Sequence, residues 1–460
     1  MSNLLAARSQ MGMSLAFHII FAVLGMGLPV LLLAAEGVWL RTGNPVYLTL
    51  AKRWAKAFAI LFAVGAVSGT MLSFELGLLW PVFMRYAGGI IGLPFSAEGF
   101  AFFIEAIFLG LYLYGWDRLS PRAHWLCAIP LAISGTLSAI FVISANAWMN
   151  SPAGFRIVNG AVVDVDPIAA MFNQAWFQQS LHMVFAAYIA TGFSAAGIYA
   201  WGMLRGKIDA YHRAGLTIAL TLGAIVAPLQ LISGDLSARW VAANQPVKFA
   251  AIEGLFRTEA GAPFTIGGWP DPATQQNRYG IAVPHLLSLL AFHDPNAVVR
   301  GLDEWPRDEQ PDPRIVHLAF QAMIGAATIL IAVSLWYGFG LWQSRRAASV
   351  TFPRRALLRA LVVSAPLGFL AIEAGWVVTE AGRQPWIIHR IMRTSAAVTP
   401  VPGQFVAFGG FFVVYLILAI TCATLLIRLG RMPLVSTPLT PGSTLSPPGI
   451  RGQKDRHVLV

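Results

Sequence analysis

Residues 11–35 read MGMSLAFHIIFAVLGMGLPVLLLAA, a run that holds no Asp, Glu, Lys or Arg. As an α-helix, which rises 1.5 Å per residue, this run is long enough to cross the ~30 Å of hydrocarbon in a lipid bilayer. Its only titratable side chain is His18. The stretch therefore predicts a membrane-spanning helix with one polar ring buried among apolar side chains.

The rest of the chain repeats this pattern. Hydrophobic residues make up 57% of the sequence, charged residues make up 12%, and the mean hydropathy is +0.64. Further apolar windows lie at 57–80, 97–116, 124–149, 180–204, 214–233, 315–341, 357–380 and 405–428. They are continuously apolar rather than alternating, which favours helices over a β-barrel. We expect an all-α integral membrane protein with nine transmembrane helices.

The basic residues orient this bundle. Most of the 32 Lys and Arg residues fall in segments that are cytoplasmic if the N-terminus lies outside, in the periplasm, and the C-terminus in the cytoplasm. In this orientation the basic residues that give the net charge of +11 lie near anionic lipid headgroups, so the charge does not imply a nucleic-acid partner. The two cysteines, Cys127 and Cys422, lie in apolar windows and exclude a disulfide framework or a zinc site.

Four parts follow from this topology. Residues 1–233 hold helices one to six, residues 234–314 form one long outer loop, and residues 315–430 hold helices seven to nine. The outer loop is rich in Pro and Gly, and much of it is expected to be irregular. Residues 431–460 combine Ser, Thr, Pro and Gly with charged residues, which predicts a disordered cytoplasmic tail.

Polar side chains inside the spans indicate function, because a charge in lipid costs at least ~2.5 kcal/mol. They are His18, Glu75, Glu98, Glu105, His182, Glu373 and Glu380. Several of them share one depth in the outer half of the membrane, together with Met323 of the seventh span. Two histidines, a methionine and a carboxylate on different helices are the donors that a stack of hemes needs. Taken singly, each has a plainer explanation as a hydrogen-bonded or packing side chain.

The carboxylates also recur at a fixed spacing. Glu98 and Glu105 are seven residues apart, as are Glu373 and Glu380, so each pair lies two turns apart on one helix face. Each pair covers ~10 Å of membrane depth. Such pairs suit the passage of protons, although Ser, Thr or Trp donors on neighbouring helices could also satisfy them.

Five segments give the chain a resemblance to a known family, from the first span to the ninth. They are EGFAFFIEAIFLGLYLYGWDRLSP (98–121), SANAWMNSP (144–152), NQPVKFAAIEG (244–254), FQAMIG (320–325) and GWVVTEAGRQPW (375–386). With them the sequence resembles subunit I of the cytochrome bd quinol oxidases. Its length and short loop after AAIEG are similar to the short quinol-loop branch, which includes cyanide-insensitive oxidases.

The resemblance implies three hemes, namely two b-type hemes, one low-spin and one high-spin, and one chlorin heme d. His182 and Met323 would be the axial pair of the low-spin heme b. His18 and Glu380 would ligate the two high-spin hemes, and which of them holds heme d stays open. Cofactor-binding residues of the same motif would be Trp376, Arg383, Gln384 and Trp386, with Arg383 near heme propionates.

The resemblance also implies sites for quinol and protons. Lys248 and Glu253 would serve quinol oxidation, and without the family match they would be a solvated Lys and Glu on a loop helix. Glu98, Glu105 and Ser138 are the candidates for proton delivery to the oxygen-reducing end. Gln321 departs from the family pattern, where Arg is frequent, which places the potential of the low-spin heme in question.

The implied activity is quinol:oxygen oxidoreduction in a respiratory chain, with generation of a proton gradient. The expected partners are subunit II, membrane quinol, O2 and the lipid bilayer of the bacterial inner membrane, and binding of a small single-helix accessory subunit stays open. The alternative is a proton-coupled transporter, which would also place carboxylates in the membrane. A transporter gives no reason for His and Met to share one layer. A heme-copper oxidase would need a histidine cluster, which the spans lack.

Overall fold

The computed structural model describes residues 2–346 and 353–433, so the predicted tail lies outside the described residues from 434 onward. Nine helical stretches in the described part are long and apolar enough to span a membrane, which confirms the predicted fold class. They are α1 (Asn3–Thr42), α2 (Pro45–Leu79), α3 (Pro81–Tyr114), α4 (Pro121–Asn150), α6 (Trp176–Leu204), α7 (Ala210–Asn244), α10 (Pro313–Arg346), α11 (Arg355–Ser364) with α12 (Leu367–Ala381), and α14 (Gln404–Arg431).

The first helices form antiparallel pairs because their turns are short and strongly signalled. Gly43 ends α1 with a φ of 67° and donates its N–H to the Trp39 carbonyl, and Asn44 caps α2. Ser120 caps α4 by accepting from the Ala123 N–H, and α2, α3 and α4 each begin with a proline. Proline in the first turn and glycine after the last are the expected helix boundaries.

Two spans differ from the sequence-based expectation. The sixth span was expected to end at residue 233, but α7 continues to Asn244, and its Asp235 and Arg239 form an ion pair one turn apart. These two charges satisfy each other on the helix surface, so the helix need not end where the apolar run does. The eighth span divides into α11 and α12 at Pro366, which has no N–H to continue the helical hydrogen bonds.

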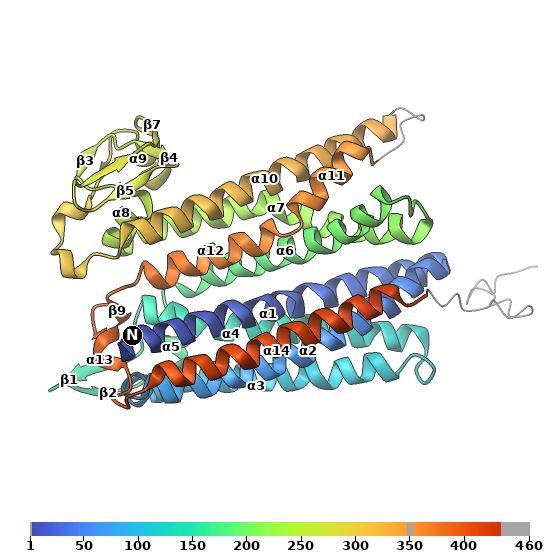
Figure 1. The fold of residues 1–460 in the computed structure, drawn as a ribbon, viewed down its shortest axis with the longest axis horizontal. Coiled ribbons are helices and arrows are strands. Elements are labelled where there is room, and N and C mark those ends of the chain that lie inside the picture. The colour runs from blue at the N-terminus through green and yellow to red at the C-terminus, as the bar shows by residue number, and fades with distance from the viewer. Residues whose placement is uncertain (1, 347–352, 434–460) are drawn as a thin grey trace, which may run out of the picture.

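The loops hold short elements that lie at one end of the bundle, together with the N-terminus (Figure 1). Between α4 and α6 are β1 (Arg156–Val158), β2 (Ala161–Val163) and α5 (Pro167–Met171). The long loop contains α8 (Pro246–Glu253), β3 (Glu259–Ala260), β4 (Phe264–Ile266), β5 (Trp269–Asp271), β6 (Gln276–Arg278), β7 (Ile281–Val283), α9 (Leu286–Phe292), β8 (Val298–Val299), η1 (Leu302–Glu304) and η2 (Arg307–Glu309). After α12 follow β9 (Trp386–Ile388), β10 (Met392–Arg393) and α13 (Thr394–Ala397). The strands pair as antiparallel two-stranded ribbons, so the loop is more ordered than its composition predicted.

A buried apolar cluster joins the helices that carry the expected ligands. Ile19, Val23 and Met26 of α1 pack in it with Ala187 and Ala190 of α6, and with Ile372 of α12. The contact is close: a Cβ added to Gly368 of α12 would lie 2.5 Å from the Ala190 Cα. The packing of α1, α6 and α12 therefore fixes the relative positions of the polar side chains described next.

Candidate functional site

His18 is held between α1 and α2 by one ring nitrogen. Its Nδ1 lies 2.9 Å from the Ser68 Oγ, and the Ser68 hydroxyl donates to the Gly65 carbonyl. The serine oxygen therefore accepts from Nδ1–H, which leaves the lone pair on Nε2. A Cβ at Gly69 would approach the ring to 2.8 Å, so the ring needs a glycine there. An imidazole fixed through one nitrogen is the arrangement of a metal ligand.

His182 is built the same way between α6 and α7. Its Nδ1 lies 3.1 Å from the Ser233 Oγ, and Ser233 donates to the Gln230 carbonyl. The histidine and serine are separated by 51 residues, and His18 and Ser68 by 50. The Gln230 amide lies 3.2 Å from the His182 Nε2. A metal bound at this nitrogen would take the place of that amide contact.

Met323 stands on α10, which packs against both α7 and α12, as α6 does. A Cβ at Gly375 of α12 would lie 3.1 Å from the Met323 Sδ. The sulfur therefore lies against α12 at a position where the facing residue has no side chain. His182 of α6 and Met323 of α10 thus come from two helices that both pack against α7 and α12.

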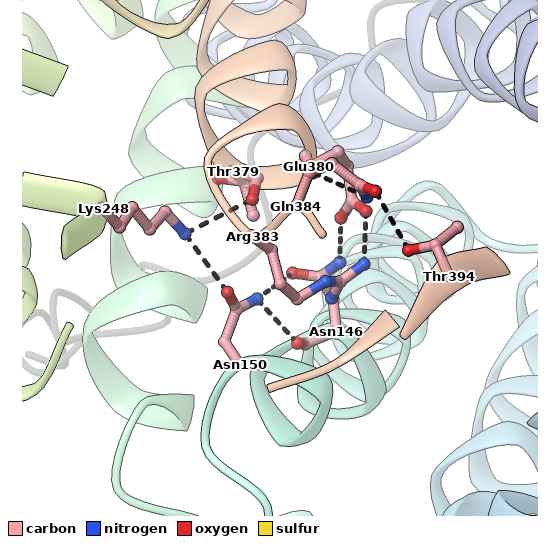
Figure 2. A network of polar contacts seen from close by, with 8 residues as sticks. All are labelled: Asn146, Asn150, Lys248, Thr379, Glu380, Arg383, Gln384 and Thr394. Carbon is pink, nitrogen blue, oxygen red and sulfur yellow. Dashed lines mark hydrogen bonds and ion pairs between the residues drawn. The ribbon is translucent and has the colours of Figure 1, made fainter. Parts of the chain in front are cut away.

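Glu380, at the end of α12, lies at the centre of a polar network (Figure 2). Asn146 of α4 donates to one carboxylate oxygen, and Arg383 donates to the other. Gln384 contacts the Glu380 carbonyl at 3.4 Å and accepts from the Thr394 hydroxyl at 3.0 Å. The network therefore fixes the carboxylate from α4 and from the loop after α12.

The same network reaches Lys248 of the long loop. The Lys248 Nζ donates to the Asn150 Oδ1 at 3.1 Å and to the Thr379 carbonyl at 3.3 Å. The Asn150 amide in turn donates to the Asn146 Oδ1 at 3.2 Å. An expected quinol-site residue and an expected heme ligand are thus connected through two asparagines (Figure 2).

The network carries more positive charge than Glu380 balances. Arg383 is 4% exposed, and its Nε and Nη1 have no hydrogen-bond partner. Burial and the neighbouring Arg383 lower the pKa of Lys248 to about 7, against the opposing effect of Glu380. Buried donors without partners are costly, so this place fits an added anionic group such as a heme propionate.

The two tryptophans of the motif are placed separately. Trp376 packs against the apolar cluster of α1, α6 and α12. Trp386 begins β9, and the Arg393 guanidinium lies 5.2 Å from its ring centre. The first therefore lies among the ligand-bearing helices, and the second lies in the loop beyond the network.

Glu253 ends α8 and does not pair with Lys248 of the same helix. It is 6% exposed, its Oε2 has no partner, and burial raises its pKa to about 8. His317 of α10 supports this turn, because its Nδ1 lies 2.8 Å from the Ile252 carbonyl. A buried carboxyl that keeps its proton near neutral pH can exchange that proton with a bound molecule.

The three candidates for proton delivery are Glu98, Ser138 and Glu105, of which the first two are hydrogen-bonded to each other. The Ser138 hydroxyl donates to the Glu98 carboxylate at 3.1 Å. Glu105 is 5% exposed, and its carboxyl lies where α3 meets α1 and α4, because added Cβ atoms at Gly25 and Gly135 would be 3.7 and 3.1 Å from its Oε1. The two glycines leave room for this carboxyl in the bundle interior.

Gln321 has a role that its sequence position did not predict. Its Oε1 accepts from the Gly267 N–H at 2.9 Å, and its amide donates to the Thr265 carbonyl at 2.9 Å. Both bonds run to the long loop near β4. The neutral amide therefore fastens the loop to α10, a task that needs both a donor and an acceptor.

Sequence reasoning did not single out the partners of the candidate ligands. Ser68, Ser233 and Gln230 have no local motif, and only their position across a helix pair reveals them. Asn146 and Asn150 lie within SANAWMNSP, which could have pointed to them. Among the described residues, no three His, Cys, Asp or Glu side chains gather as a metal-binding group. The donors come singly, which suits axial ligation of macrocycles.

Comparison with known proteins identifies the family of the chain. Residues 6–433 match the family described as cytochrome bd terminal oxidase subunit I. A provisionally named cytochrome bd menaquinol oxidase subunit I of Bacillus subtilis (strain 168) is 38% identical, covering 91% of this chain and 94% of the relative. Cytochrome bd-II ubiquinol oxidase subunit 1 of Escherichia coli (strain K12) is 30% identical, covering 92% and 96%.

A solved structure shows the same fold. The bd oxidase from Geobacillus thermodenitrificans superposes with a TM-score of 0.86 at 38% sequence identity, over 93% of this chain and 98% of that one. The match in sequence and the match in structure each span nearly the whole chain. This chain therefore belongs to the cytochrome bd terminal oxidase subunit I family.

Proposed function

We propose that this chain is the heme-bearing catalytic subunit of a cytochrome bd-type oxidase, which oxidises membrane quinol and reduces O2 to water. The observation that carries the proposal is the pair of histidines held through Nδ1 by a serine on the next helix. Family membership favours this function over a proton-coupled transporter. The chain acts as a multi-pass protein of the bacterial inner membrane.

The proposed ligands are the residues that the family motifs indicate. His182 and Met323 would hold a low-spin heme b, since they approach from helices that flank α7 and α12. His18 and Glu380 would hold the two high-spin hemes, one of b type and one chlorin heme d. Hemes bound here would supply one-electron transfer and the reduction of oxygen. Arg383 would neutralise their propionates, with Gln384, Trp376 and Trp386 completing the pocket.

Quinol oxidation is proposed at the end of α8. In its ionised form the Glu253 carboxylate would take up a proton as quinol is oxidised, and Lys248 would orient the quinol oxygen or its anion. Asn150 and Asn146 place Lys248 two hydrogen-bonding side chains from Glu380. This short separation would keep electron donor and acceptor close.

Protons for water formation are proposed to come from the cytoplasm through Glu105, Glu98 and Ser138. With the N-terminus outside, protons released from quinol at Glu253 leave on the opposite face, which generates a proton gradient. The two relatives named above are called subunit I and subunit 1, so we propose that a subunit II completes the enzyme, with quinol, O2 and lipid as its other partners.

A direct test is the absorption spectrum and O2 consumption of the protein purified from membranes with its partners. We expect reduced-minus-oxidised bands of low-spin b, high-spin b and chlorin hemes, and O2 consumption with ubiquinol or menaquinol as donor. A protein without chlorin bands and without quinol-driven O2 consumption would refute the proposal.

A further inference from the structure

A buried hydrogen-bonded triad lies at the end of the bundle opposite the N-terminus, and the proposed function does not use it. It consists of Glu36 of α1, Tyr112 of α3 and His124 of α4, which are 0%, 0% and 2% exposed. The His124 Nδ1 lies 2.7 Å from one Glu36 oxygen, and the Tyr112 hydroxyl donates to the other at 2.8 Å. This triad joins three helices near their ends.

The hydrogen bonds of His124 define where its protons are. Its Nε2 lies 2.8 Å from the Tyr112 carbonyl, which can only accept, so Nε2 carries a hydrogen. The contact between Nδ1 and Glu36 needs a second proton, placed either on the ring or on the carboxyl. The pair therefore stores one proton in a position where it can move between nitrogen and oxygen.

The triad lies on the same helix face as the proposed proton carriers. Glu98, Glu105 and Tyr112 follow one another on α3 at seven-residue intervals, or two turns each. Successive members are ~10 Å apart along the helix axis. Gly25 and Gly135, which flank the Glu105 carboxyl, belong to α1 and α4, the helices that carry Glu36 and His124. The interface between α1, α3 and α4 thus contains both the Glu105 carboxyl and the triad.

The triad is close to the end of the bundle but not open to it. His124 is the fourth residue of α4, and Tyr112 lies two residues before the end of α3. The Trp116 ring lies against the His124 ring at a tilt of 33°, with centres 3.8 Å apart, and the Lys52 ammonium lies 5.2 Å from the centre of the Trp116 ring. Trp116 therefore packs over His124, between the triad and the Lys52 ammonium.

We infer that Glu36, His124 and Tyr112 form a proton-loading site that supplies Glu105 from the cytoplasm. This inference rests on the proposed function and on its orientation. A proton from cytoplasmic water binds the Glu36–His124 pair, passes to the Glu105 carboxylate through transiently entering water, and is replaced from the cytoplasm. Leu109 of α3 and Leu131 of α4, both buried, lie between the triad and Glu105.

If the triad had a purely structural role, its substitution would change the stability of the protein rather than proton transfer. A buried ion pair adds little stability over well-packed apolar side chains, because desolvation offsets the attraction. The informative variant is therefore Glu36→Gln, which keeps the shape and some hydrogen bonds but cannot take up a proton. Tyr112→Phe keeps the ring and removes only the hydroxyl. Tyr199→Phe is the matched control, because Tyr199 is a buried tyrosine of α6 at the same end of the bundle as the triad.

The experiment uses the complete oxidase in proteoliposomes. We expect Glu36→Gln to retain the heme spectrum while quinol-driven O2 consumption falls about ten-fold or more, with a larger solvent deuterium isotope effect. Tyr112→Phe should slow turnover by a smaller factor, Glu36→Asp should recover part of it, and Tyr199→Phe should leave it unchanged. Wild-type turnover in Glu36→Gln, or joint loss of hemes and activity in both Glu36→Gln and Tyr112→Phe, overturns the inference.

Infrared difference spectra of the oxidised and reduced protein separate this inference from the proposed function. A deuterium-sensitive carboxyl band that responds to reduction and is lost in Glu36→Gln supports the loading site whatever the electron donor is. If the wild-type protein shows this band but does not oxidise quinol, the proposed function fails, although Glu36 still changes its protonation when the protein is reduced. Absence of such a band in the wild-type protein counts against the loading site alone.

Discussion

The Lys248 ammonium donates to the side chain of Asn150, 3.1 Å away, and so joins the long loop to the end of α4. Asn150 continues through Asn146 to Glu380, which makes a loop residue part of the network around the last turn of α12 (Figure 2). Arg383 pairs directly with the Glu380 carboxylate, whereas Lys248 feels its charge without contacting it. The proposed quinol site and the proposed heme ligand are therefore coupled electrostatically as well as spatially.

This coupling gives Arg383 a greater role than an exposed ion pair would have. Arg383→Gln would remove the buried cation that pairs with the partly exposed Glu380 carboxylate, at a cost of about 2 kcal/mol. We expect a lower Tm and loss of one high-spin heme band from the purified protein. The matched control is Arg393→Gln, which breaks an exposed pair with Asp308 and should change the Tm little. Equal effects of the two variants would contradict the central place of Arg383.

The pH dependence of quinol oxidation is predicted from Glu253. Burial raises its pKa to about 8, so the carboxyl is protonated below that pH and can accept a proton only above it. Steady-state quinol oxidation should therefore rise as the pH increases through about 8. Glu253→Gln should remove this rise, whereas electrons from a donor that bypasses the quinol site should still reach O2.

The control for the pH experiment is Glu259→Gln, an exposed glutamate of β3 in the same loop. Its pH profile should match that of the wild-type protein. A rising limb that persists in Glu253→Gln would assign the titration to another group.

Gly69 tests the placement of His18. A Cβ there would lie 2.8 Å from the His18 ring, so Gly69→Ala must displace the imidazole. We expect an altered band of one high-spin heme and slower O2 reduction. Gly77→Ala on the same helix is the control, since a Cβ there meets nothing within 4 Å. Unchanged spectra in Gly69→Ala would argue against His18 as a ligand.

The nine spans could be predicted because length and apolarity are local properties of the sequence, and both survive in the structure. The contacts that shape the site are not local. Ser68 lies 50 residues from His18, and Asn146 lies 234 residues from Glu380, so no window of sequence contains both partners. The continuation of α7 past residue 233 includes Asp235 and Arg239, which pair with each other. Hydropathy alone treats two charged residues as the end of a membrane helix, so it could not predict this continuation. The family motifs indicated the candidate ligands, and the packing of the helices shows which side chains hold them in place.

Met323 provides the test of the low-spin heme. Met323→Leu nearly keeps the volume of the side chain but removes the sulfur that faces Gly375 of α12, so the fold should persist. Without an axial sulfur the low-spin heme should become five-coordinate or change its ligand, with an altered reduced band and a lower potential. Met203→Leu, a buried methionine of α6, is the matched control and should leave the spectrum unchanged. If the low-spin band and potential also survived in Met323→Leu at full heme content, another residue would have to serve as the partner of His182.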